Sequence, residues 1–283
     1  MRSWLSQYEM QQAASLDEAL QMLSREPGKW TPFAGGTDLM VLLEAGKLPK
    51  RHFLSLWGVP GLRGITYTPE AVEIGALTTY TDLLRDSTIQ SEFPLMCAAA
   101  RETGAVAIQN RGTVGGNIAN ASPAADLPPA LLVYDATLDI ASSRGVRQVD
   151  YRHFHTGYKQ MDLAPDELIV SIKVPRGRST WRQSYRKVGT RRAQAISKVC
   201  FAAAASIQDG TVTDLRIALG SVAPTVIRAT ATEAALRGQP LSSTTIQTAR
   251  AALAHDISPI DDIRSTASYR QLVAGNLLEG FFS

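Results

Sequence analysis

The spacing of apolar and polar residues predicts a small α/β unit in the first 58 or so positions. Ser15 and Glu18 have the spacing of a capping box, and leucines then recur at helical intervals until Pro27-Gly28 ends the pattern. After this amphipathic helix, which we expect to pack on a sheet, we expect a strand over 30–34, a short helix over 39–43 and a strand over 52–56.

A second unit follows, with strand patterns on both sides of a segment rich in small residues. In order, we expect strands over 65–67 and 72–74, helices over 81–84 and 93–102, a hairpin of 137–141 with 147–149, and a strand over 168–174. The segment 104–126 has few charges, and it is too rich in Gly and Asn for a long regular element.

The third unit places strands before helices. Strand patterns over 181–188, 198–207 and 211–219 are read as antiparallel, because Asp209-Gly210 is a strong hairpin signal. Helical patterns follow over 229–236, 244–254 and 267–281. This order predicts an α+β layer, an antiparallel sheet with helices on one face. We expect three domains, at 1–58, 59–176 and 177–283.

Composition narrows the class of protein. The chain has 283 residues, 45% of them hydrophobic, and a formal net charge of +3 without a basic run, which argues against a nucleic-acid partner. Apolar stretches are too short for a membrane span, and we expect a cytoplasmic protein without a signal peptide. Cys97 and Cys200 stand in apolar surroundings and are expected to be buried, and they are too few for a zinc or iron–sulfur site.

Two glycine loops carry the candidate chemistry. Gly35 and Gly36 lie between a predicted strand and a predicted helix, where free N–H groups and the hydroxyl of Thr37 suit a pyrophosphate. Taken alone, this loop is better explained as a plain tight turn, because double-glycine turns are common.

The second loop, 111–126, combines glycines with the short donors Thr113, Asn117, Asn120 and Ser122. It could also be a polar loop that satisfies its own backbone. Two such loops in one chain favour a large phosphate-containing ligand. Neither matches G-x-G-x-x-G or G-x-x-x-x-G-K-[ST], which argues against a Rossmann dehydrogenase and a P-loop NTPase.

Three stretches together resemble the medium, FAD-binding subunit of the xanthine dehydrogenase and aerobic carbon monoxide dehydrogenase group. They are Ala34-Gly-Gly-Thr-Asp-Leu39, Arg111-Gly-Thr-Val-Gly-Gly-Asn117 and Ala121-Ser-Pro-Ala-Ala-Asp126. Further similar segments, at 166–172, 185–192 and 218–224, extend the resemblance over nearly the whole chain. It implies a PCMH-type FAD-binding fold of two α+β subdomains with FAD between them, followed by a C-terminal α+β domain.

The resemblance also implies residue roles. Backbone N–H groups of both loops would wrap the pyrophosphate; they belong to Ala34, Gly35, Gly36 and Thr37 and to Gly115, Gly116 and Asn117. Thr113 would add a hydroxyl, and Asn120 would contact phosphate or ribityl groups. Asp126 would accept hydrogen bonds from sugar or ribityl hydroxyls, and Asp38 and Leu39 would lie near the flavin ring. Ile169 would contact the ring or the adenine, and Lys187 would place a positive charge near the flavin pyrimidine.

Some of these residues have a simpler interpretation. Without the resemblance, Lys187 would be taken as a solvated strand lysine, and Arg191 and Arg192 as surface charges or partner contacts. His153 and His155 flank Phe154 in an expected loop, and such a pair is weak evidence for a metal. No metal site and no catalytic residue are assigned to this chain.

The family implies an electron-transfer role within a complex. A large molybdopterin-binding subunit would oxidise the substrate, a small subunit would carry [2Fe–2S] clusters, and FAD in this chain would pass electrons to NAD⁺ or another acceptor. A dimer of such heterotrimers is expected. The alternatives are a stand-alone PCMH-type flavin oxidoreductase and a scaffold subunit that has lost its flavin.

Overall fold

The computed structural model describes residues 7–283, and its first unit is a small parallel sheet. The strands β1 (Glu9–Gln12), β3 (His52–Ser55) and β2 (Thr31–Phe33) lie in that order, with helices α1 (Leu16–Arg25) and α2 (Leu39–Glu44). α1 begins at Ser15, whose hydroxyl accepts the N–H of Glu18. The carboxylate of Glu18 accepts the N–H of Ala14 rather than that of Ser15, so the expected capping box is shifted by one residue.

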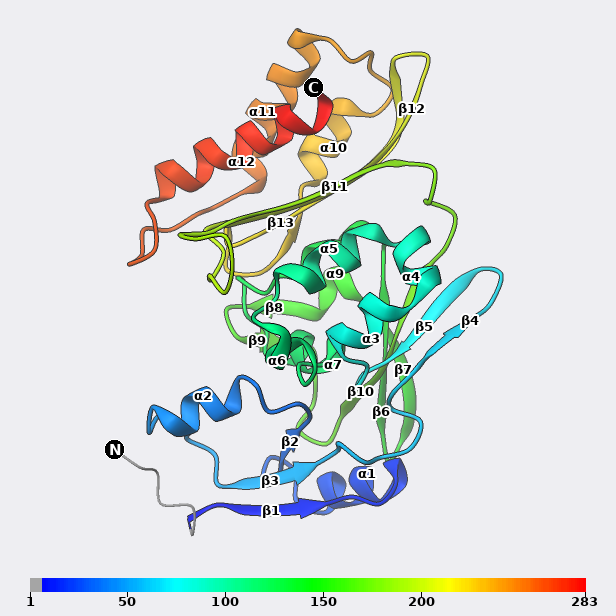
Figure 1. The fold of residues 1–283 in the computed structure, drawn as a ribbon, viewed down its shortest axis with the longest axis vertical. Helices are drawn as coiled ribbons and strands as arrows, with labels where there is room; N and C mark the ends of the chain where they lie inside the picture. Colours follow the sequence, from blue (N-terminus) through cyan, green and yellow to red (C-terminus); the bar gives the residue numbers. More distant parts are fainter. Residues whose placement is uncertain (1–6) are drawn as a thin grey trace.

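The middle unit is built on a five-stranded antiparallel sheet. Its order is β4 (Ile65–Tyr67), β5 (Ala71–Gly75), β10 (Leu168–Pro175), β6 (Thr137–Ser142) and β7 (Gly145–Asp150). Its helices are α3 (Tyr80–Arg85), α4 (Ser87–Glu92), α5 (Pro94–Glu102), α6 (Val106–Gln109), α7 (Val114–Ala119), α8 (Pro128–Val133) and α9 (Tyr151–Phe154). A small hairpin joins β8 (His155–Gly157) to β9 (Gln160–Met161). Figure 1 shows α3, α5 and α7 between the first unit and the C-terminal sheet.

The C-terminal unit is a four-stranded antiparallel sheet with three helices. The order is β11 (Arg182–Val188), β12 (Val199–Gln208), β13 (Thr211–Gly220) and β14 (Ile227–Arg228). The helices α10 (Thr230–Leu236), α11 (Ser243–Asp256) and α12 (Ala267–Phe282) cover the face away from the middle unit (Figure 1). Asp209 and Gly210 both have positive φ, 49° and 74°, as the predicted hairpin turn requires.

The second face of this sheet is also covered. α8 packs on β12 and β13, and α5 packs on β11. Alternate residues of β12 therefore belong to different cores: Phe201 and Ala203 pack with the C-terminal helices, whereas Ala202 and Ala204 pack with the middle unit. The run of alanines lets helices approach both faces of the sheet. The sequence predicted helices on one face only, but helices of the middle unit also cover the other face.

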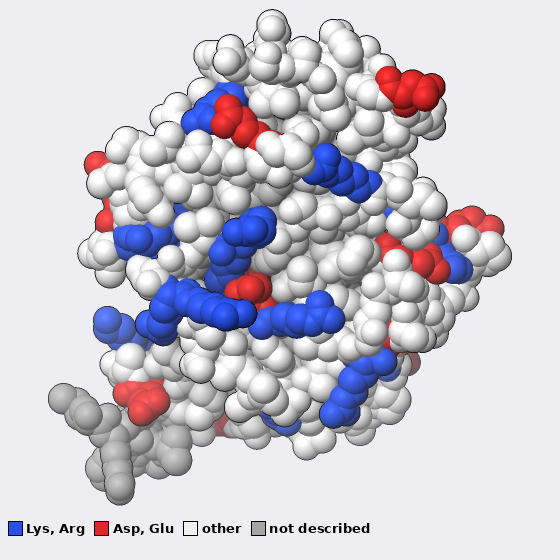
Figure 2. Space-filling model, turned by 45° about the horizontal axis from the view of Figure 1, so that its top comes forward, with Lys and Arg blue, Asp and Glu red and all other residues white. Residues whose placement is uncertain are grey.

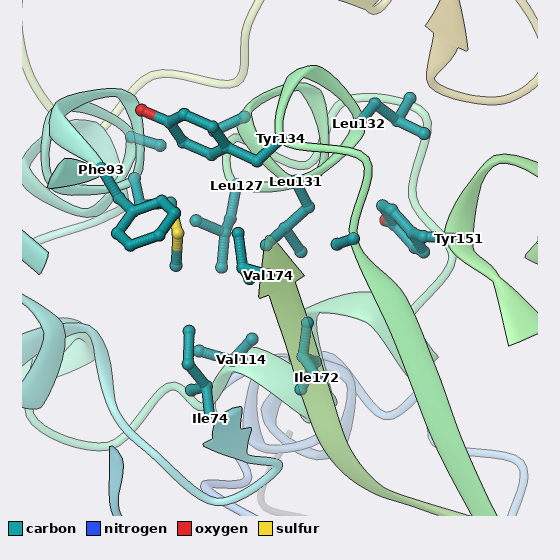
Figure 3. Close-up of a cluster of buried hydrophobic side chains, with 14 of the residues drawn as sticks. Ile74, Phe93, Val114, Leu127, Leu131, Leu132, Tyr134, Tyr151, Ile172 and Val174 are labelled. Carbon is teal, nitrogen blue, oxygen red and sulfur yellow. The ribbon is translucent and has the colours of Figure 1, made fainter. Parts of the chain in front are cut away.

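A large apolar core joins the middle unit to this sheet. Figure 3 shows Phe93 and Tyr134 packed edge to face above Val174 and Ile74, with ring centroids 5.1 Å apart. A smaller core under the first unit includes Leu168 from β10, which ties that unit to the ends of the central strands. Cys97 and Cys200 are buried free thiols, as the sequence predicts, and burial raises the pKa of both.

The α+β organisation predicted from the sequence is confirmed, and most expected elements occur within a residue or two of their predicted ends. The expectation of a loop around His153 and His155 is wrong: His153 lies in α9 and His155 begins β8. The segment 104–126 has no long element, as expected, but it contains the short helices α6 and α7. Among residues 7–283, no helix is both long and apolar enough to span a bilayer.

Candidate cofactor site

The first glycine loop turns sharply between β2 and α2. Gly36 has φ +72°, and a Cβ there would lie 2.3 Å from the ring of Phe33, so only glycine fits. A Cβ on Gly35 would lie 1.7 Å from the carbonyl oxygen of Arg111 in the second loop. The two loops, predicted from separate parts of the sequence, therefore touch through the backbone at Gly35.

This loop presents a row of backbone donors. Within the described part of the chain, no protein acceptor receives the N–H groups of residues 35–38, and the hydroxyl of Thr37 has no partner. Asp38 precedes α2 without capping it through its side chain. Consecutive N–H groups of this kind suit an anion such as a phosphate. Ala34 adjoins them, and its Cβ would lie 3.7 Å from a Cβ placed on Gly116 of the second loop.

The second loop uses its backbone differently from the sequence-based expectation. Thr113 begins α7, and its hydroxyl accepts the N–H of Gly116 at 3.1 Å. Gly115 donates to the carbonyl of Ala76 at 2.8 Å, and Asn117 donates to that of Thr113 at 2.9 Å. The N–H groups of Gly115, Gly116 and Asn117 are therefore engaged within the protein. Their expected role as phosphate donors stays a prediction, and these N–H groups form the capped first turn of a helix.

Two side-chain atoms in the same region lack the partners that buried polar atoms normally have. They are Oδ1 of Asn117 and Oδ1 of Asp126, each inaccessible to solvent and without a hydrogen bond in the described structure. The hydroxyl of the buried Tyr80 lies near both residues, and its pKa is raised, first by burial and then by the charge of Asp126. Unpartnered acceptors of this kind fit a ligand that brings hydroxyl or amide donors.

Asp126 forms a buried ion pair with Lys187. The Nζ of Lys187 donates to Oδ2 of Asp126 at 2.7 Å and to the carbonyl of Glu102 at 2.8 Å. Their side chains are only 6% and 11% exposed, so the interpretation of Lys187 as a solvated strand lysine is wrong. Burial raises the pKa of Asp126 to about 6, although Lys187 acts in the opposite direction. The pair joins the second loop to β11.

The remaining predicted residues are spread around these loops. Asn120 follows α7, and Leu39 begins the half-buried side of α2. Ile169 lies on β10, 7% exposed, within the main core. Arg191 is exposed and donates to the carbonyls of Ala193 and Gln194 in its own loop.

Sequence reasoning missed Lys159 here, and it considered His155 only as weak evidence for a metal. Lys159, in the hairpin between β8 and β9, donates to the carbonyl and to Oδ1 of Asn120, both at 2.7 Å. His155 lies with Nε2 2.9 Å from the carbonyl oxygen of Ile118 in α7. A single basic residue in a short turn gives no periodic signal, and only Gly157 two residues earlier marked the turn. In residues 7–283, no three His, Cys, Asp or Glu side chains are grouped to hold a metal ion.

Comparison with known proteins identifies the family of both parts of the chain. Residues 6–177 match the model of the FAD binding domain in molybdopterin dehydrogenase, and residues 183–283 match that of the CO dehydrogenase flavoprotein C-terminal domain. The chain is 34% identical over 260 residues to the xanthine dehydrogenase FAD-binding subunit of Escherichia coli O157:H7, covering 91% of this chain and 89% of that protein. It is 28% identical to the carbon monoxide dehydrogenase medium chain of Hydrogenophaga pseudoflava, covering 96% and 94%.

Solved structures give the same result. A chain of carbon monoxide dehydrogenase from Hydrogenophaga pseudoflava superposes with a TM-score of 0.93 at 30% identity, covering 97% of this chain and 95% of that one. A chain of quinoline 2-oxidoreductase from Pseudomonas putida 86 gives a TM-score of 0.89 at 28% identity, with 97% and 95% covered. The family resemblance drawn from the loop motifs is confirmed: the chain belongs to the FAD-binding subunits of the molybdopterin-dependent dehydrogenases.

Proposed function

We propose that this chain holds FAD as the electron-transfer subunit of a heteromeric molybdenum hydroxylase. Electrons would enter from [2Fe–2S] clusters of a small partner subunit, after substrate oxidation in a large molybdopterin-binding subunit, and leave to NAD⁺ or another acceptor. The relatives named as medium chains and FAD-binding subunits of dehydrogenases support this assignment. We also propose a cytoplasmic location and a dimer of heterotrimers.

One observation carries the cofactor part of the proposal: the row of N–H groups at residues 35–38 that no protein acceptor receives. They would hold the FAD pyrophosphate, with Thr37 adding its hydroxyl. Gly116 keeps the space between the two loops free of a side chain, because a Cβ placed on it would lie 3.7 Å from the Cβ of Ala34. Bound FAD supplies one- and two-electron redox chemistry, and the protein supplies position and electrostatics.

Other residues would orient the rest of the cofactor. Oδ1 of Asn117 and Oδ1 of Asp126 would accept hydrogen bonds from ribityl or sugar hydroxyls. Lys187 favours the charged form of Asp126 against the effect of burial, so any influence on the flavin would come from the pair rather than from a free cation. Asp38, Leu39 and Ile169 would lie toward the flavin ring or the adenine.

We further propose functional domain limits at 1–58, 59–176 and 177–283. The two family matches, at 6–177 and 183–283, support a division near residue 177. The strands β1, β3 and β2 form a sheet of their own, which supports a division of the first part near residue 58.

The cofactor proposal is tested by titrating the full chain, stripped of flavin, with FAD. Binding of one FAD per chain, followed by flavin fluorescence and visible absorption, is the expected result. A chain that takes up no FAD would contradict the proposal and favour a scaffold role.

The subunit proposal needs the assembled protein. A tagged chain isolated from its own host should bring down two further subunits, together with molybdenum and iron that the chain alone lacks. Recovery of a yellow protein of this chain alone, active with an organic substrate, would instead favour a stand-alone flavin oxidoreductase.

A further inference from the structure

Lys159 lies where the two loops meet. β8 and β9 are joined by Tyr158 and Lys159, and Figure 1 shows this hairpin beside α6 and α7, on the side where α2 lies. The ammonium of Lys159 is 2.7 Å from both the carbonyl oxygen and Oδ1 of Asn120, at the end of α7. It also interacts electrostatically with Asp38, the last residue of the first loop.

The backbone of Lys159 is in an unfavourable conformation for its residue type. Its φ is +56°, in the left-handed region where glycine and asparagine are at ease and lysine is strained. Lys159 is the third residue of the tight turn 157–160, and one class of such turns takes positive φ at this position. Here that conformation accompanies an ammonium directed at Asn120.

The charge of Lys159 is not neutralised by an ion pair. In residues 7–283, no carboxylate oxygen lies within 4 Å of its Nζ, whose two close partners are neutral oxygens. Partial burial lowers the pKa of Lys159, and Asp38 opposes this effect. Two other cations of the second loop and β11 are engaged: Lys187 binds Asp126, and Arg111 stacks 3.7 Å from the centre of the Trp57 ring. Figure 2 shows basic side chains gathered around an acidic one in the middle of the face it draws.

We propose that the ammonium of Lys159 pairs with the diphosphate of the dinucleotide bound at residues 35–38. This inference rests on the proposed FAD site and names a residue that closes it. A dianion held by neutral N–H groups next to the carboxylate of Asp38 needs a cation, and Lys159 reaches both loops. Without the dinucleotide, Asn120 keeps the ammonium in place.

The test uses the full chain stripped of flavin, in wild-type form and as Lys159→Gly and Lys159→Arg. Glycine removes the charge and the contacts with Asn120 but relieves the left-handed backbone, so the variant should unfold close to the wild-type temperature. Lys29→Gln is the matched control, because Lys29 is an exposed lysine whose ion pair is with Glu26. FAD affinity is measured by fluorescence quenching at several salt concentrations.

For Lys159→Gly we expect FAD affinity to fall about tenfold at low salt, as the loss of one charge-assisted bond implies. Its affinity should also depend less on salt, because one ionic contact is missing. Lys159→Arg should bind within about threefold of wild type, and Lys29→Gln should be unchanged.

Unchanged FAD affinity in Lys159→Gly would overturn the inference. So would a loss that is equal at every salt concentration and that arginine does not restore, since this would indicate a structural role. Both outcomes are distinguishable from failure of the proposed function, in which the wild-type chain itself binds no FAD.

Discussion

At the scale of single residues, Gly35 fixes the distance between the loops. A Cβ on residue 35 would lie 1.7 Å from the carbonyl oxygen of Arg111. In the Gly35→Ala variant, one loop must therefore move away from the other. Overpacking of this kind costs about 1–3 kcal/mol of folding free energy. We expect Gly35→Ala to retain less than about a tenth of the wild-type FAD, since displaced N–H groups lose a charge-assisted bond worth tenfold or more in affinity.

Flavin content after gel filtration and denaturant unfolding measure the two effects of this substitution. Gly280→Ala is a suitable control, because Gly280 lies in α12 and a Cβ there meets no atom within 4 Å. Alanine should stabilise that helix by up to about 1 kcal/mol and leave flavin content unchanged. Wild-type flavin content in Gly35→Ala would mean that the loops need not touch.

At the scale of elements, α7 is held at both ends. Thr113 caps its start, and the carbonyl of Ile118 near its end is 2.9 Å from Nε2 of His155. A carbonyl oxygen only accepts, so Nε2 carries the hydrogen and donates it. Burial lowers the pKa of His155, and the bond to Ile118 only partly opposes this effect. The folded protein therefore favours the neutral ring.

This preference gives a pH dependence with a definite sign. The folded-state pKa of His155 lies below its unfolded value near 6.5, so its contribution to stability is present above pH 6.5 and is lost as pH falls. His155→Gln keeps a donor for Ile118 but cannot titrate. We expect its free energy of unfolding, measured in denaturant from pH 5 to 8, to fall less steeply below pH 6.5 than that of wild type. Parallel curves for the two proteins would show that His155 does not couple stability to pH.

Elements with a clear hydrophobic period or a turn or capping signal could be predicted from the sequence, and others could not. The hairpin at Asp209-Gly210 and the helix after Ser15 carry local signals that their structures follow. α8 lacks such a signal, because all six of its residues are buried and no polar face marks its period. β1 lacks one for the opposite reason, since its four residues are all exposed.

In the candidate site too, local motifs could be predicted from the sequence, whereas contacts between distant residues could not. The glycine loops are local patterns and were visible in the sequence. The pairing of Asp126 with Lys187, 61 positions away, and the approach of Lys159 to Asn120 depend on how the sheets and helices pack. Local patterns carry no information on such partners, which explains why Lys187 could be mistaken for a surface residue.

At the scale of the whole molecule, two groups of polar contacts join the middle and C-terminal units across their shared core. At one end, Asp135 accepts hydrogen bonds from Arg178, Arg216 and Arg228 at 2.5, 3.0 and 2.5 Å. At the other, Lys187 binds Asp126, and Ser221 donates its N–H to the carbonyl of Pro123 at 2.7 Å. The second contact holds the loop that carries the proposed ribityl acceptor, so the C-terminal unit helps to shape the cofactor site.

Removal of Lys187 should therefore destabilise the chain in a pH-dependent way. In Lys187→Met the buried carboxyl of Asp126 loses its partner, and its pKa, already raised to about 6, rises further. A folded pKa above the unfolded value gives a contribution that is present at low pH and lost as pH rises through the folded pKa. In the flavin-free chain we expect a loss of about 3 kcal/mol in unfolding free energy at pH 8, and a much smaller loss at pH 5. The double variant Lys187→Met with Asp126→Asn removes both charges, and denaturant unfolding should show a smaller deficit that no longer changes between these pH values. An equal loss at both pH values in the single variant would mean that packing of the lysine stem, rather than its charge, holds the two units together at this point.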